Sequence, residues 1–324
     1  MRLLYEKTLD GVCLQRCYGL DKILEIPDTA GGLPVTELAG YIFSDTVRRR
    51  EPPPGEYRGE PELCGSQVEE ISLPDTVRKV GAYGFYNCCG LRKLSCSSAV
   101  EDWGAGVFTG CTGLEYLDIR IAEDRKSCFK DILSELHQTL IVNYRDSSGT
   151  LLAKLIFPEF FEESVENTPA RIIMREMHGC GHMYRYCFDG GAFRFDEYDR
   201  LFPHVKVQEK PELAVRLALY RLYWPCGLRE SAEDEYWDYV RTHAGEGAKG
   251  LIERGERDIL GFMARSARLG EDEIKKMIEA AAGSGDAQSS ALLLDVKHRR
   301  LSPAGRTGQG EEAKRCGRKR TFEL

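Results

Sequence analysis

The chain has 324 residues, of which 42% are hydrophobic, and a formal net charge of −7 at pH 7. This length allows about two or three domains with buried cores, and the negative charge argues against nucleic-acid binding by the protein as a whole. No run of about 18 apolar residues occurs, so the sequence predicts no membrane span. The first residues lack the apolar core of a signal peptide, because Glu6, Lys7 and Asp10 interrupt them. We therefore expect a cytoplasmic protein whose twelve cysteines are free thiols.

A repeat of 23 residues runs from Ile71 to Ile119. Advancing the sequence by 23 positions places residues of the same kind on one another, namely Gly81 on Gly104, Phe85 on Phe108, Cys88 on Cys111 and Leu91 on Leu114. A period of this length is typical of stacked coils, each with one short strand and a return path, whose apolar faces merge into a continuous core. The sequence therefore predicts a short β-solenoid.

An earlier copy of the repeat begins at Ile26-Pro27-Asp28-Thr29 and continues through Val35, Leu38 and Phe43, with a five-residue insertion around Gly31-Gly32-Leu33-Pro34. Between this copy and the next lie residues 44–67, which are rich in Pro, Arg and Glu. We predict an exposed loop there, or a repeat that has lost its pattern.

Three cysteines in nine residues, Cys88, Cys89 and Cys96, raise the alternative of a metal site. Buried thiols explain them better, because Cys88 and Cys111 occupy the same position of successive repeats and Cys96 replaces the leucine at position 73. Adjacent cysteines also rarely bind one ion together, and zinc sites usually show pairs of cysteines with about two to four residues between them.

The stretch "VEEISLPDTVRKVGAYGFYNCCGLRKL" resembles the BspA-like leucine-rich repeat of bacterial proteins. The matching positions are Leu73-Pro74, Val77, Val80-Gly81, Phe85, Cys88 and Leu91. The next copy departs from the pattern at Ser97 and Trp103. The resemblance covers about residues 15 to 122, and it implies a binding surface, often on a bacterial cell surface, with no catalytic residues to transfer.

After the repeats, helical spacing predicts a helix over about 126–138, and a hairpin follows with strands 139–144 and 151–157. This segment is a candidate cap for the open end of the repeats. A cluster further on, His178, Cys180, His182 and Cys187, contains imidazole and thiol groups that suit zinc or copper. Two alternatives remain for it: a metal- or thiol-dependent site, or a structural turn with exposed histidines.

From about residue 209 the pattern is helical, beginning with "PELAVRLALYRLYW", and the short helices are separated by glycines at 255, 270 and 283–285. The succession loosely resembles ankyrin-type helical hairpins, without their T-P-L-H signature. Ser231, with Asp234 three residues later, suggests a capping box. The tail, residues 301–324, has few apolar residues, and this composition predicts disorder. Its basic residues leave nucleic-acid binding open as a third, less favoured function.

Together these observations predict an α+β multi-domain protein. Its expected parts are leucine-rich repeats over 1–122 with a loop insertion at 44–67, a small α/β connector or cap over 123–207, a helical-hairpin domain over 208–300 and a disordered basic tail over 301–324. We predict a non-enzymatic interaction module with no cofactor, an unidentified protein partner and no membrane partner. The exposed candidates for contact are Glu69, Arg92 and Glu115.

Overall fold

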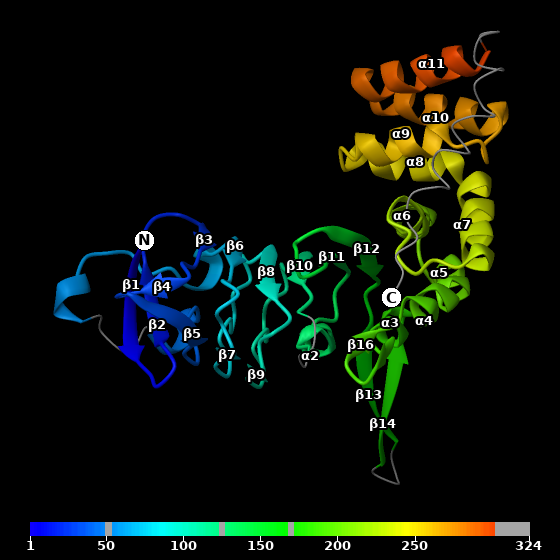
Figure 1. The fold of residues 1–324 in the computed structure, drawn as a ribbon. Coiled ribbons are helices and arrows are strands. Elements are labelled where there is room, and N and C mark those ends of the chain that lie inside the picture. Colours follow the sequence, from blue (N-terminus) through cyan, green and yellow to red (C-terminus); the bar gives the residue numbers. More distant parts are fainter. Residues whose placement is uncertain (49–53, 123–126, 168–171, 302–324) are drawn as a thin grey trace. The chain divides into compact units, whose positions relative to one another are not determined.

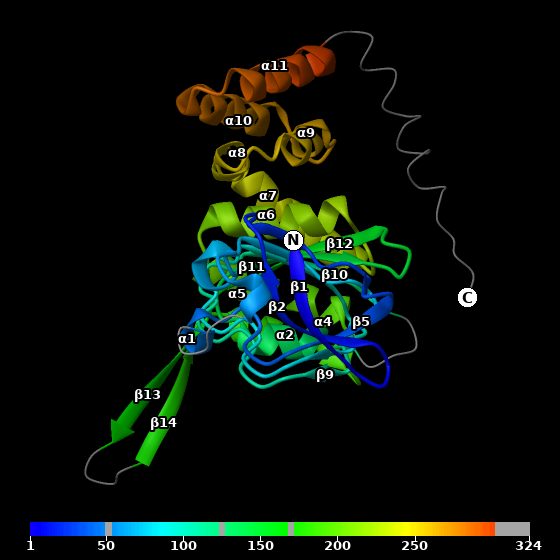
Figure 2. The same cartoon turned by 90° about the vertical axis from the view of Figure 1, so that its left-hand side faces the viewer.

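The computed structural model describes residues 1–48, 54–122, 127–167 and 172–301 (Figures 1 and 2). The chain divides into two compact units. The first comprises Met1–Gln208 and Trp224–Leu228, and the second comprises Glu209–Tyr223 and Arg229–Leu324. The repeats lie in the first unit and the predicted helical region lies almost entirely in the second.

A six-stranded sheet carries the strands of the repeats. Its order is β12-β11-β10-β8-β6-β3, and all neighbours are parallel except the β11–β12 pair. Leu94 lies opposite Ile71 on one side and Leu117 on the other, so the strands pair at the predicted offset of 23 residues. The strands are β3 (Ile23–Glu25), β6 (Glu70–Ser72), β8 (Lys93–Ser97), β10 (Tyr116–Arg120), β11 (Leu140–Arg145) and β12 (Leu151–Phe157).

The return paths of the repeats form a second sheet, in the order β1-β2-β5-β7-β9. Val80 pairs with Leu38 and with Trp103, which confirms the register expected for the earlier copy. The predicted insertion forms an antiparallel pair between β4 (Thr29–Ala30) and β5 (Leu33–Leu38). The remaining strands are β1 (Arg2–Lys7), β2 (Val12–Tyr18), β7 (Lys79–Val80) and β9 (Asp102–Trp103).

Aromatic rings stack along the core of the repeats. The ring centroids of Phe43 and Phe85 lie 5.4 Å apart, and those of Phe85 and Phe108 lie 5.6 Å apart. The Cys88 thiol donates to the Phe43 carbonyl at 3.2 Å, and the Cys111 thiol donates to the Phe85 carbonyl at 3.0 Å. Both thiols are buried, which raises the pKa of Cys111 to about 12. The prediction of core thiols is confirmed for this pair.

Glycine at two equivalent positions lets successive coils approach. A Cβ at Gly81 would lie 2.3 Å from the Gly40 nitrogen, and a Cβ at Gly104 would lie 2.4 Å from the Ala82 nitrogen. These separations are far below van der Waals contact, so any side chain would push the coils apart. Glycine therefore recurs at positions 81 and 104 because a side chain at either would clash with the neighbouring coil.

Part of the segment 44–67 is folded rather than exposed. It contains α1 (Asp45–Arg48) and the 3-10 helices η1 (Gly55–Tyr57) and η2 (Gly65–Gln67); residues 49–53 lie outside the described residues. The rings of Tyr57 and Tyr18 stack at 4.6 Å, and Leu63 is buried, with its amide donating to the Cys17 carbonyl. The prediction of an exposed loop is therefore wrong for these side chains, which pack against β2.

The rest of the first unit contains the predicted helix in a shorter form, α2 (Phe129–Glu135), and the predicted hairpin β11–β12. A second hairpin, which the sequence did not predict, pairs β13 (Phe161–Asn167) with β14 (Ile172–His178) and projects from the unit (Figure 2). Short elements complete the unit: α3 (Gly181–Tyr184), β15 (Phe188–Asp189), β16 (Ala192–Phe193), α4 (Phe195–Arg200) and α5 (Phe202–Gln208).

The second unit is helical. Within it α6 packs on α7 and α8, α10 packs on α8 and α11, and α9 packs on α11. None of the described helices is both long and apolar enough to cross a bilayer. The predicted capping box at Ser231 is wrong, because α7 begins at Glu230 with Arg229 as its N-cap. The predicted disordered tail falls outside the described residues, apart from its first residue. The helices are α6 (Pro211–Tyr223), α7 (Glu230–Thr242), α8 (Ala244–Glu253), α9 (Arg257–Arg265), α10 (Glu271–Ser284) and α11 (Ala287–Leu301).

Candidate protein-binding surface

The three residues predicted as contacts occupy one row at the start of the repeat strands. The amide of Arg92 donates to the Glu69 carbonyl at 2.7 Å, and the amide of Glu115 donates to the Arg92 carbonyl at 3.0 Å. Lys22 extends the row, because its carbonyl accepts from the Glu69 amide and its ammonium lies 2.6 Å from the Glu69 carboxylate. We call Lys22, Glu69, Arg92 and Glu115 the charged row, in which positive and negative residues alternate.

The charged row is accessible to a partner. Arg92 is exposed, the Glu69 side chain is 47% exposed, and Glu115 is half-buried. Each of the three residues directly precedes a strand whose core side chains are fixed by neighbours above and below. Their spacing is therefore set by the strand separation of about 4.8 Å rather than by flexible loops.

Beside the charged row, the outer face of the six-stranded sheet is polar. Along each strand the residues alternate between the core and this face, as Leu94 and Leu117 are buried while their neighbours are not. We call the outward residues of the central strands the sheet face: Glu70, Ser72, Lys93, Ser95, Tyr116 and Asp118. Tyr116 is its exposed aromatic residue, at 38%. The face thus combines a tyrosine with charges of both signs.

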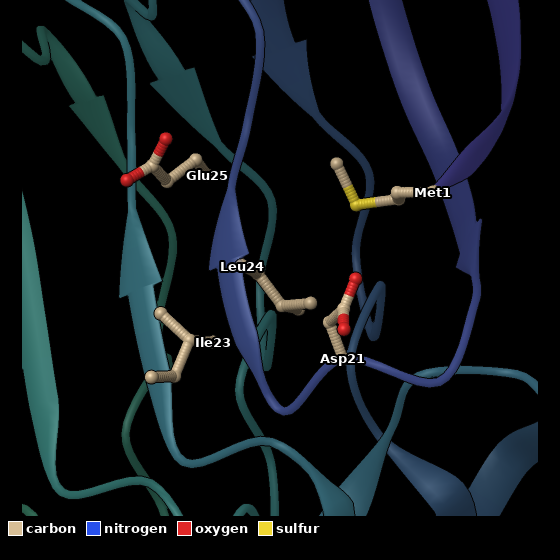
Figure 3. Close-up of a pocket in the computed structure, with 5 residues that line it drawn as sticks. All are labelled: Met1, Asp21, Ile23, Leu24 and Glu25. Atoms are coloured by element: carbon tan, nitrogen blue, oxygen red, sulfur yellow. The ribbon is translucent and has the colours of Figure 1, made fainter.

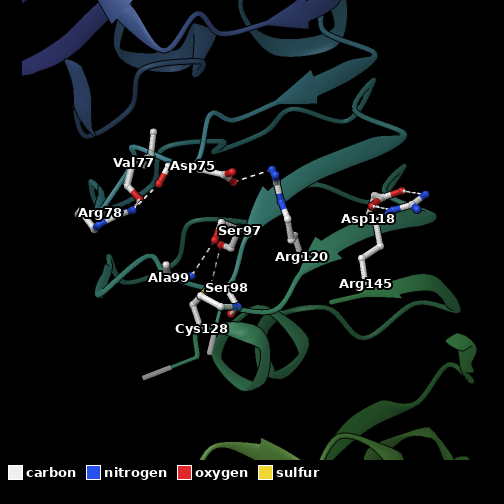
Figure 4. A network of polar contacts seen from close by, with 11 residues as sticks. Asp75, Val77, Arg78, Ser97, Ser98, Ala99, Asp118, Arg120, Cys128 and Arg145 are labelled. Atoms are coloured by element: carbon white, nitrogen blue, oxygen red, sulfur yellow. Dashed lines mark hydrogen bonds and ion pairs between the residues drawn. The ribbon is translucent and has the colours of Figure 1, made fainter. Parts of the chain in front are cut away.

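Ion pairs between strands order the sheet face. The Lys93 ammonium lies 3.4 Å from the Glu70 carboxylate. Asp118 accepts two hydrogen bonds from the Arg145 guanidinium, at 2.7 and 3.1 Å (Figure 4). It accepts a third from the Asn143 side-chain amide at 3.0 Å. The hydrogen bond that Arg145 donates to Asp118 raises the pKa of Arg145. Two-point contacts of this kind hold side chains in fixed positions better than single ion pairs do.

The opposite end of the strands is also tied by polar contacts. Arg120 pairs with Asp75 across the stack (Figure 4). The Ser98 hydroxyl accepts from the Ala122 amide at 2.9 Å, and the Ser98 carbonyl accepts from the Cys128 amide at 3.0 Å. These bonds attach Ala122 and Cys128 to the last repeats.

Two side chains that follow the repeats in the sequence form hydrogen bonds with backbone groups of the last coil. The Glu135 carboxylate accepts from the Phe108 amide at 3.0 Å, and burial raises the pKa of Glu135. The Gln138 amide donates to the carbonyls of Cys111 and Leu114 at 3.1 and 3.0 Å. In the preceding coil the equivalent amide, that of Phe85, donates to the Val107 carbonyl of the next coil, so the Glu135 carboxylate takes the place of a further repeat at Phe108.

The second set of predicted site residues is not gathered around a common point suited to a metal. Cys180 and Cys187 are buried, and burial raises the pKa of Cys187 to about 12. His178 ends β14, where its Nε2 lies 3.1 Å from the Glu163 carboxylate, and His182 lies in α3 with Nδ1 3.0 Å from the Gly179 carbonyl. Among all described residues, no group of three or more His, Cys, Asp or Glu is placed to hold a metal ion.

The physical reason is the backbone after His178. An extended segment would place alternate residues on one face, but the chain turns at Gly179, with a φ of 89°, and enters α3 at Gly181. A Cβ at Gly181 would lie 2.1 Å from the Pro158 carbonyl, so this glycine lets the turn pack against the chain that directly follows β12. The glycines around Cys180 are thus explained by the fold.

Arg185 is a buried charge that the sequence analysis missed. It is 3% exposed, and its guanidinium donates at 2.6–2.8 Å to four carbonyls, those of Leu136, Gln138, Pro158 and Gly181. Burial lowers the pKa of Arg185 to about 10. The residue joins α2, β12 and α3, and no spacing or motif around it indicates this role.

Comparison with known proteins finds a repeat family in the same region as the 23-residue period. Residues 62–144 match the family described as "BspA type Leucine rich repeat region (6 copies)". No curated protein matches the chain. A solved structure of a leucine rich cell surface protein from Faecalibacterium prausnitzii A2-165 is similar at 16% identity and a TM-score of 0.27, over 45% of this chain and 41% of that one.

A second similar structure is the T. pallidum leucine rich repeat protein, at 21% identity and a TM-score of 0.21, over 36% of this chain and 68% of that one. The chain thus spans less than half the length of the first of these structures. The 23-residue register, the stacked phenylalanines and the family match all concern the same part of the chain. Residues 62–144 of this protein thus match the BspA-type leucine-rich repeat family that the sequence resembles.

Proposed function

We propose that the protein is a non-enzymatic protein-binding module, and that the charged row and the sheet face form its contact surface. The observation that supports the proposal is the constant register of β6, β8 and β10, which repeats each outward position at intervals of 23 residues. Regularly spaced side chains on a rigid sheet suit recognition of another protein, as in other repeat proteins.

The expected domain organisation supports this use. We propose that residues 1–122 act as a short solenoid, that residues 123–207 cap its end, and that residues 208–300 form an ankyrin-like array of helical hairpins. Two contacts with the last coil support the capping role: the Glu135 carboxylate accepts from the Phe108 amide, and the Gln138 amide donates to the Cys111 and Leu114 carbonyls. Buried thiols such as Cys88 and Cys111 suit a reducing compartment, and we place the protein in the cytoplasm.

The charges of the row contribute to selectivity more than to affinity. An exposed ion pair is worth about 0–1 kcal/mol, whereas like charges placed opposite each other are unfavourable. A partner that presents alternating charges at the strand spacing is therefore preferred over one with a single sign. Tyr116, which is 38% exposed, supplies apolar contact area next to the row.

The proposal is tested by reversing the charges of the row in the full chain. The variant Glu69→Lys/Arg92→Glu/Glu115→Lys is compared with wild type for proteins captured from a lysate, and a protein lost from the variant is then purified and titrated. We expect its Kd to weaken about tenfold or more. The matched control, Lys275→Glu/Glu279→Lys, exchanges an exposed ion pair of α10 and is expected to bind as wild type.

A partner bound equally by wild type and the triple variant would contradict the proposed surface. Circular dichroism and urea unfolding of the variants separate loss of binding from loss of folding. Because the three substituted side chains lie outside the core, we expect the unfolding midpoint to change little.

A further inference from the structure

The two ends of the six-stranded sheet differ in how their outer edges are covered. At one end, β12 turns the amide and carbonyl of Ile156 outward, and the Tyr198 hydroxyl accepts from the first at 3.0 Å and donates to the second at 2.6 Å. At the other end, no described strand pairs with the outer side of β3. One edge is therefore occupied by a side chain, and the other is open as far as the described residues go.

The backbone of β3 is ready to pair with a further strand. Lys22 directs its carbonyl toward β6, where it accepts from the Glu70 amide, and the Ile26 amide donates to Ser72 in the same direction. Because successive residues of a strand alternate their hydrogen-bonding direction, Ile23 and Glu25 direct their amides and carbonyls toward the open side. Four backbone groups are thus presented to an incoming strand.

A hollow of about 280 Å³ lies against this edge, lined by Met1, Asp21, Ile23, Leu24 and Glu25. Ile23 and Glu25 point to one side of β3, whereas Leu24 points to the other side, toward Asp21 and Met1 (Figure 3). Ile23 is 59% exposed and Met1 is 48% exposed. An added strand would cover apolar surface at this edge in addition to forming hydrogen bonds.

The charge at the edge is negative. Asp21 and Glu25 are both exposed, and neither forms an ion pair or side-chain hydrogen bond within the described part of the chain. The neighbouring lysine, Lys22, is already paired with Glu69 at 2.6 Å. An occupant with a basic side chain would neutralise carboxylates that no described residue pairs with.

We propose that β3 is a strand-addition site for an extended segment of a partner protein. The segment continues the parallel sheet, with an apolar side chain opposite Ile23, a second apolar side chain opposite Leu24 and a basic side chain opposite Glu25. A second copy of this chain fits less well, since pairing two β3 edges would bring four carboxylates, two of Asp21 and two of Glu25, into one interface. The site adjoins the Lys22 end of the charged row, but its lining includes none of Glu69, Arg92 and Glu115 and no residue of the sheet face.

The test uses the full chain and a labelled peptide with the core sequence Thr-Val-Ile-Lys-Thr, whose binding is followed by fluorescence anisotropy. Two control peptides differ at one position each: Glu replaces Lys, or Pro replaces the central Ile. The first reverses the charge, and the second removes an amide needed for pairing. We expect the Lys peptide to bind and both controls to bind about tenfold more weakly or worse.

A variant of the protein provides the reciprocal exchange. Glu25→Lys leaves the folded core unchanged, because Glu25 is exposed, and it is expected to lose the Lys peptide and gain the Glu peptide. Asp10→Lys, which adds the same charge in the turn between β1 and β2, is expected to behave as wild type. Arg92→Glu/Glu115→Lys is also expected to bind the Lys peptide normally. The strand-addition site and the proposed contact surface can therefore be refuted independently of each other.

Three results would overturn the strand-addition site. The first is no binding of the Lys peptide up to about 1 mM, and the second is equal binding of the Lys peptide and either control. The third is a concentration-dependent dimer in analytical ultracentrifugation that Glu25→Lys changes, because it would assign the edge to a second copy of the chain.

Discussion

The rings of Phe85 and Phe108 stack with their centroids 5.6 Å apart and their planes inclined by only 10°. Phe43 continues the stack at 5.4 Å from Phe85. Residues that are 23 positions apart in the sequence therefore have equivalent surroundings, and the middle ring of the stack contacts a phenylalanine on each side. The stability of the repeats depends on this column.

Phe85→Ala should destabilise the first unit strongly. Removal of a fully buried phenyl ring costs about 3–5 kcal/mol, through lost burial and the cavity that remains. Phe85→Leu, which keeps most of the volume, should cost less. Urea unfolding followed by tryptophan fluorescence measures the difference, and an unchanged midpoint for Phe85→Ala would show that the column is not continuous.

Gly81→Ala should destabilise the protein although it adds only one methyl group. The new Cβ would lie 2.3 Å from the Gly40 nitrogen, so the two coils must separate. Gly283→Ala is the matched control, because its Cβ would meet no atom within 4 Å and Gly283 is a helical residue in the last turn of α10. The control should stabilise its helix by about 0.5–1 kcal/mol. Thermal unfolding that shifts both variants in the same direction would contradict this account.

The adjacent cysteines should differ in reactivity. Cys89 is exposed, whereas Cys88 is buried and donates its thiol to the Phe43 carbonyl. Burial raises the pKa of the Cys88 thiol well above its usual range, so almost none of the reactive thiolate is present at pH 8. Alkylation with iodoacetamide, located by mass spectrometry, should label Cys89 first. Equal labelling of the two in the folded protein would be inconsistent with the buried position of Cys88.

Tyr198→Phe should weaken the covered edge of the sheet. The substitution removes both hydrogen bonds to Ile156 and leaves a buried amide and carbonyl unsatisfied, at a cost of about 1–3 kcal/mol. Hydrogen exchange of the Ile156 amide should become faster. Tyr186→Phe serves as the control, since Tyr186 is 66% exposed, and should leave exchange at Ile156 unchanged.

The sequence predicts the repeats well because their period has a single structural cause. Each match, such as Gly81 with Gly104 or Cys88 with Cys111, reflects the same contact made in successive coils. The predicted contact residues Glu69, Arg92 and Glu115 share a row for the same reason, although their role in binding remains a prediction.

Features without a period were not predicted. Tyr57 and Leu63 are isolated apolar residues in a polar segment, and only the tertiary contact with Tyr18 and Cys17 shows that they are buried. The metal-like spacing around Cys180 was misleading, because the turn at Gly179 separates side chains that an extended strand would align. Arg185 binds four distant carbonyls, and no local pattern reports contacts of that kind.

The central claim, that Glu69, Arg92 and Glu115 form one contact surface for a protein partner, is tested most directly by photo-crosslinking. A benzophenone amino acid replaces each of the three residues in turn, and Lys275 of α10 in the control. The account predicts that the three positions of the charged row crosslink the same protein and that position 275 does not. Three different products, or the same product from position 275, would contradict it.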